Sequence, residues 1–139
     1  MRSEWTFAQK GVLFLATVLT LWSIAGLIAN PDFATGANAT SKSVLGVDFN
    51  GWHAVSGLLL LVPGLVLALR PTWALLYAFY AGFVNLVTGF WALADTQPYG
   101  LLEFPNNESD AILHFTFAFA FLAVGAVQLA RNRSATAAT

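Results

Sequence analysis

The chain has 139 residues, of which 58% are hydrophobic and only 9% charged, whereas roughly 25% of the residues in an average globular domain are charged. The net charge of −1 excludes a basic surface for nucleic acid, so no nucleic-acid partner is expected. The absence of cysteine excludes disulfides, thiolate metal ligands and cysteine nucleophiles.

The charged residues divide the chain into four long apolar runs. No Asp, Glu, Lys or Arg occurs in residues 11–31, 49–69, 71–94 or 111–130, and each run reaches the roughly 20 residues that a membrane-spanning helix needs. We therefore predict an all-α fold, an integral membrane bundle of four transmembrane helices that forms a single domain over residues 1–139. The expected spans cover about residues 11–29, 51–69, 72–94 and 110–130.

Two of these runs permit another interpretation. The first has the position of a signal peptide, but its apolar core, Val12–Ala29, is longer than the roughly 7–15 residues usual there, and we expect a retained span. The last run contains HFTFAFAFLAV, in which Phe alternates with small residues at the period of a strand. A membrane barrel strand needs only about 9–11 residues, so the length of this run favours a helix.

The basic residues set the expected orientation. With four spans, both termini lie on the same side of the membrane, and five of the six basic residues fall on that side. Because Lys and Arg are enriched in cytoplasmic segments, we expect both termini in the cytoplasm and the two longer loops outside. The five residues are Arg2, Lys10, Arg70, Arg131 and Arg133, and Lys42 is the exception.

The only two histidines of the chain each stand near the start of a predicted span. Asn50 is a good helix N-cap, which places His53 in the first turn of the second span. Asn107 is an expected N-cap of the fourth span, and together with Asp110 it resembles a capping box. Asp110 and His114 are four residues apart and share one helix face. Because both helices start on the outer side, we expect both histidines at one membrane level, facing the bundle interior.

The third span carries an amide well within the membrane. Asn85 is costly in hydrocarbon unless it is hydrogen-bonded, so we expect it to face the bundle interior. It is either an interhelical hydrogen-bonding group or a contact for a ligand or ion. Ala74, Ala78 and Gly82 follow one another at four-residue spacing and predict a seam of small residues for a closely packed partner helix.

The chemistry available to the chain is limited. It has no G-x-S-x-G, H-E-x-x-H or glycine-rich phosphate loop, so no enzymatic activity is expected and no catalytic residue is assigned. Two histidines on facing helices could ligate a haem axially, hold a divalent metal together with a carboxylate, or relay protons. They could also only cap and bridge the two helices. The candidate polar or ligand site comprises Asn50, His53, Asn85, Asp110 and His114.

Two stretches resemble a known family. LGVDFNGWHAVSGLLLLVPG and SDAILHFTFAFAFLAVG are similar to the domain of unknown function 4383 family, small four-helix membrane proteins common in actinobacteria. The resemblance runs from about Leu45 to Gly125. The family often carries a second histidine one turn after the first, where this chain has Gly57, and this departure weighs against a site with several histidines. The resemblance implies the four-helix fold and a bacterial cytoplasmic membrane but no activity.

These observations leave several functions open. The function we expect is that of a small accessory or structural subunit of a larger membrane assembly, in contact with the lipid bilayer and with other membrane proteins or copies of itself. The alternative is a protein that binds haem or a divalent metal at His53 and His114. A transporter or channel is a weaker alternative, because so short a chain would have to form an oligomer.

Overall fold

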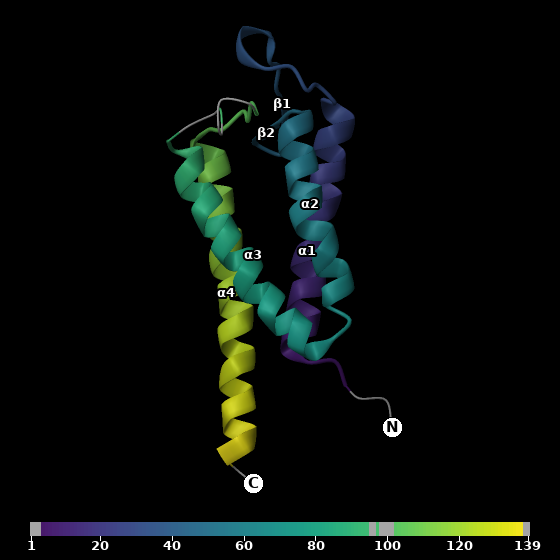
Figure 1. Ribbon diagram of the computed structural model, residues 1–139, viewed down its shortest axis with the longest axis vertical. Coiled ribbons are helices and arrows are strands. Elements are labelled where there is room, and N and C mark those ends of the chain that lie inside the picture. Colours follow the sequence, from purple (N-terminus) through teal and green to yellow (C-terminus); the bar gives the residue numbers. More distant parts are fainter. Residues whose placement is uncertain (1–3, 95–96, 98–101, 138–139) are drawn as a thin grey trace.

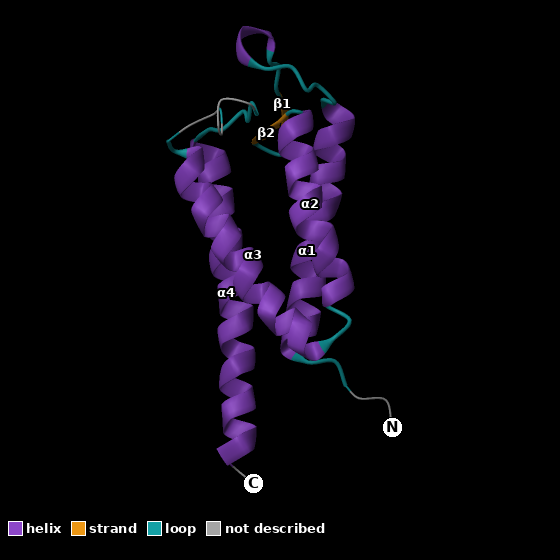
Figure 2. Ribbon diagram, in the orientation of Figure 1, coloured by secondary structure: helices purple, strands orange, loops and turns teal. Residues whose placement is uncertain are grey.

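The computed structural model describes residues 4–94, 97 and 102–137. In this part the chain forms four α-helices, one short 3-10 helix and one two-stranded hairpin (Figure 2). The all-α prediction is confirmed. Their bounds in chain order are α1 Phe7–Ala29, η1 Gly36–Asn38, β1 Lys42–Val44, β2 Val47–Phe49, α2 Gly51–Leu67, α3 Pro71–Ala92 and α4 Glu108–Ala137.

Three of the helices, α1, α3 and α4, are long and apolar enough to cross a membrane, whereas α2 has 17 residues. Two helices extend beyond the predicted spans. α1 begins at Phe7 rather than near residue 11 because Thr6 and Gln9 form a capping box, in which each side chain bonds the other residue's backbone N–H. α4 continues to Ala137, well beyond the apolar run.

The helices form two pairs. α1 packs along α2 and α3 packs along α4, and the two pairs meet at the end where α1 and α3 begin, with the last turns of α4 extending beyond them (Figure 1). We name this the terminal end. The pairs separate toward the opposite end, which carries residues 30–50 and 102–107 and which we name the loop end. Arg2, which contributed to the orientation argument, lies outside the described residues.

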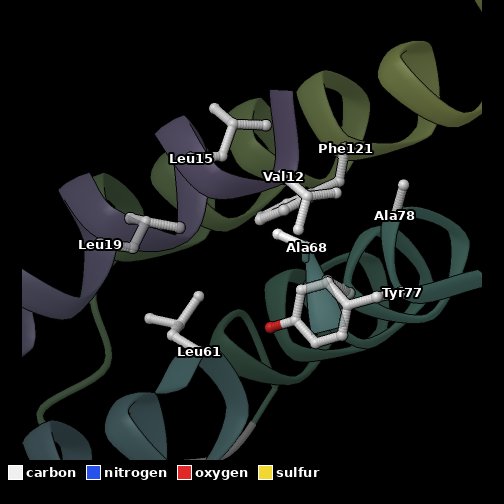
Figure 3. Close-up of a cluster of buried hydrophobic side chains, with 9 residues drawn as sticks. Val12, Leu15, Leu19, Leu61, Ala68, Tyr77, Ala78 and Phe121 are labelled. Atoms are coloured by element: carbon white, nitrogen blue, oxygen red, sulfur yellow. The ribbon is translucent and has the colours of Figure 1, made fainter. Parts of the chain in front are cut away.

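The largest hydrophobic core lies where the two pairs meet (Figure 3). Tyr77 of α3 connects the pairs there, because its ring packs on Gly64 of α2 and its hydroxyl donates to the Leu60 carbonyl at 2.6 Å. A Cβ atom at Gly64 would lie 2.5 Å from this ring, so a glycine permits the close approach. The buried residues of this core are Val12, Leu15, Leu19, Leu61, Ala68, Tyr77, Ala78, Ala81 and Phe121.

The predicted seam of small residues on α3 faces α4. Ala74, Ala78 and Gly82 are all buried, and a Cβ atom at Gly82 would lie 2.7 Å from the Leu122 side chain. Such close backbone approach is how helices associate where water provides no hydrophobic driving force. In the neighbouring pair, α2 continues through Pro63.

The segment of residues 30–50, between α1 and α2, contains a two-stranded hairpin. β1 and β2 are antiparallel, with Val44 opposite Val47, and Leu45 and Gly46 make the turn with φ of 52° and 87°. Positive φ at both central residues is the geometry that matches the twist of a two-residue hairpin. The Trp22 indole N–H donates to the Val44 carbonyl at 3.0 Å, so the hairpin is fixed against α1.

Candidate metal centre

The helix starts place both histidines at the loop end. The Asn50 side chain accepts from the His53 backbone N–H at 2.9 Å, which caps α2 and sets His53 in its first turn. Asn107 accepts from the Asp110 backbone N–H, also at 2.9 Å, so it is the side-chain cap at the start of α4. The predicted capping box is wrong, however, because the Asp110 carboxylate makes no hydrogen bond to any described group.

The Asp110 carboxylate lies between the two imidazoles. Its Oδ1 atom is 3.5 Å from Nε2 of His53 and 3.7 Å from Nε2 of His114. The three ligand atoms lie within 4.8 Å of one another, and Asp110 is completely buried. Two side chains from α4 and one from α2 thus converge on one point, although α2 and α4 belong to different helix pairs.

Hydrogen bonds to the other ring nitrogens fix both imidazoles. Nδ1 of His53 lies 2.9 Å from the Asp48 carbonyl, which can only accept, so this nitrogen carries hydrogen. Nδ1 of His114 lies 3.0 Å from Oδ1 of Asn85. That amide is oriented by its own N–H, which donates to the Ala81 carbonyl at 2.8 Å, so Nδ1 of His114 also carries hydrogen.

Residues of β2 and of the segment before α4 cover the centre at the loop end. The Phe49 ring stacks on His53 at 4.6 Å between ring centroids, and Phe104 lies 6.2 Å from the same imidazole. Asn50 donates its side-chain N–H to the Glu103 carbonyl at 2.6 Å, which ties the segment before α4 to the start of α2. Aromatic rings and loop backbone therefore cover this side of the cluster.

The structure brings together all five residues that the sequence singled out. His53, Asp110 and His114 form the centre, Asn85 orients His114, and Asn50 positions His53. Sequence reasoning missed Asp48, because it acts through its backbone carbonyl, which any residue type would provide. It also missed Phe49 and Phe104, which no local pattern distinguishes from the chain's other phenylalanines.

The histidines and the aspartate match a recognised donor set. Imidazole nitrogen and carboxylate oxygen are ligands of Zn²⁺ and of non-haem iron, and sites with two histidines and one carboxylate keep positions open for a further ligand. Metal-ligating histidines usually donate their other ring N–H to a carbonyl or carboxylate. Both histidines make such a contact here, to the Asp48 carbonyl and to the Asn85 amide oxygen.

The molecule is thus an all-helical protein with three helices able to cross a membrane and a cluster of two partly buried histidines and one buried carboxylate. The model of a family described as a domain of unknown function (DUF4383) matches residues 9–127, and the chain belongs to this family. Comparison with curated proteins and with solved structures gave no match.

Proposed function

We propose that the chain is an integral membrane protein of the bacterial cytoplasmic membrane, with all four helices crossing the bilayer and both termini in the cytoplasm. Three helices meet the requirement of length and apolarity. The 17 residues of α2 lie at the lower limit for a span, which is roughly 17–25 residues. The distribution of basic residues supports the orientation.

Cysteine labelling tests this orientation without background, because the chain has no cysteine of its own. Ser41→Cys lies in the loop before β1, and Ser134→Cys lies near the end of α4. In intact cells, an impermeant thiol reagent is expected to label the first variant and to label the second only after permeabilisation. The reverse pattern would invert the orientation.

We propose further that the protein binds one divalent transition-metal ion at His53, Asp110 and His114. One observation carries this proposal: a buried carboxylate without a hydrogen-bond donor among the described residues faces two imidazole nitrogens that carry lone pairs. Three convergent acceptors repel one another, and an unpaired carboxylate is costly to bury. A bound cation removes both penalties, because it accepts electron pairs from all three atoms.

The spacing suits a single ion better than a haem. Ligand atoms about 2.1 Å from a tetrahedral ion lie about 3.4 Å from one another, close to the 3.5 and 3.7 Å that separate the imidazole nitrogens from the carboxylate. A haem held by two axial histidines would need its ring to pass between them, and Oδ1 of Asp110 occupies that position. Of the two cofactors considered from the sequence, we propose the metal.

Metal analysis of the purified protein tests the proposal. After incubation with Zn²⁺ and removal of excess ion, the wild type is expected to retain about one equivalent, and Asp110→Asn is expected to retain almost none. Glu108→Gln is the matched control, because it removes the same charge from the same helix start but from an exposed side chain. Equal zinc retention by Asp110→Asn and the wild type would refute the site.

A proton shared among the same three residues is the competing explanation. In that case the cluster only bridges the two helix pairs, as the simplest sequence interpretation has it, and zinc is not retained. The roles of accessory subunit and of oligomeric transporter stay predictions. Copurification of further chains in mild detergent tests the first, and metal flux into vesicles tests the second.

A further inference from the structure

A cavity of about 270 Å³ lies beside the metal centre. All four helices line it, and Phe49 and Phe104 line it from the loops. Its lining residues lie toward the loop end, where the helix pairs separate (Figure 1). Largely apolar pockets with a few polar groups are the usual binding sites for small molecules, and this cavity has that character.

The walls of the cavity are apolar and carry no charged side chain. Leucine, phenylalanine, tryptophan, valine and alanine side chains form most of them, and Ser23, Ser56 and Thr88 add hydroxyl groups. No Asp, Glu, Lys or Arg lines the cavity in the part of the chain that the structure describes. A charged ligand head would therefore find its counter-charge only at the metal centre.

The metal centre is open toward this cavity. His53 and His114 line it and are 15% and 17% exposed, whereas Asp110 is buried behind them. An ion held by the three residues would keep its remaining coordination positions on the cavity side. A divalent ion with one carboxylate and two neutral imidazoles has a net charge of one positive unit, and an apolar environment makes that charge strongly attractive to an anionic oxygen donor.

We infer that the cavity binds a small molecule with an apolar body and a single anionic oxygen head, such as a medium-chain carboxylate. The head completes the coordination of the ion and neutralises it, while the body lies among the apolar side chains. A cavity of about 270 Å³ has room for a chain of several carbons, and an eight-carbon carboxylate serves as the probe. This inference rests on the proposed metal site.

Tryptophan fluorescence provides the test, because Trp22 and Trp91 both line the cavity. The protein is placed in lipid nanodiscs, its zinc content is measured, and 8-bromooctanoate is added as a quencher. We expect saturable quenching that is roughly tenfold tighter with zinc than after chelation. The matched alcohol, 8-bromooctanol, has the same body without the charge, and its quenching is expected to be independent of zinc.

A pair of variants locates the binding. Val84→Phe adds volume inside the cavity, and Val87→Phe makes the same change on the exposed outer face of the same helix. The first is expected to lose bromooctanoate binding while retaining zinc, and the second to keep both. Zinc retention without zinc-dependent bromooctanoate binding would overturn this inference and leave the metal site intact. Failure to retain zinc would overturn both.

Discussion

Replacing Asn85 with leucine is expected to weaken the bundle although it removes a polar group from an apolar region. The Asn85 amide joins α3 to α4, accepting from the His114 imidazole at 3.0 Å while donating to its own helix. An interhelical hydrogen bond in a membrane protein is worth about 0.6 kcal/mol and at most about 2. The His114 N–H left without an acceptor adds to this, so we expect a loss of about 1–2 kcal/mol.

Thr88→Val is the matched control. Thr88 lies on the same helix within one turn and lines the same cavity, but its hydroxyl donates to the Val84 carbonyl within α3. Removing such a bond leaves no partner on another helix unsatisfied, so the free energy of unfolding should change little. Reversible unfolding in mixed detergent micelles, followed by circular dichroism, measures both variants against the wild type.

A second readout separates packing from metal chemistry. If His114 is a ligand, Asn85 is the group that orients it, and loss of such a partner lowers metal affinity by about 10–100-fold. Zinc affinity of Asn85→Leu should therefore fall, while Thr88→Val should bind zinc normally. An Asn85→Leu protein that is as stable as the wild type, or more so, would mean that the amide does not join the helices and would refute this reasoning.

Three further changes test other parts of the fold. Tyr77→Phe removes the hydroxyl that bonds the Leu60 carbonyl and should lower the free energy of unfolding by about 0.6 kcal/mol; an unchanged value would contradict this. Hydrogen bonds, chiefly from the Thr40 hydroxyl, lower the pKa of Asp32 from 3.8. The ionised carboxylate therefore stabilises the loop above pH 3.8, and this stabilisation is lost as the pH falls through the pKa of the folded state. The Thr40 amide resonance should titrate below pH 3.8 and lose this titration in Asp32→Asn. Leu45→Asn should stabilise the hairpin by roughly 1 kcal/mol, because Asn tolerates positive φ better than Leu, and faster amide exchange in the strands would contradict it.

The helices and the candidate residues could be predicted because the physics that places them is local. Four charge-free runs indicated the four helices, and the N-cap preference of Asn50 fixed where His53 falls on α2. The four-residue spacing of Asp110 and His114 put them on one face of α4, and the cost of a buried amide indicated that Asn85 faces inward.

The contacts that define the centre could not be predicted, because they depend on distant backbone. The carbonyl that fixes His53 belongs to Asp48, on a hairpin whose turn contains Leu45, a residue that rarely takes positive φ. The sequence therefore predicted only a long loop there. At Gly57 a Cβ atom would lie 2.5 Å from the Ser23 hydroxyl, so the close packing of α1 on α2 leaves little room there for a larger side chain.

The geometry of the helix starts explains why Asp110, more than either histidine, decides whether a cation can bind. α2 and α4 both begin at this end, and a helix start carries a partial positive charge of roughly half a unit. Two such starts beside two neutral imidazoles would repel a cation. The backbone N–H groups of His53 and Asp110 already donate to their Asn caps. They therefore stabilise the Asp110 carboxylate through their electric field and do not hydrogen-bond to it. In the proposed metal site, the carboxylate would thus keep its lone pairs for the ion and supply the negative charge that holds it.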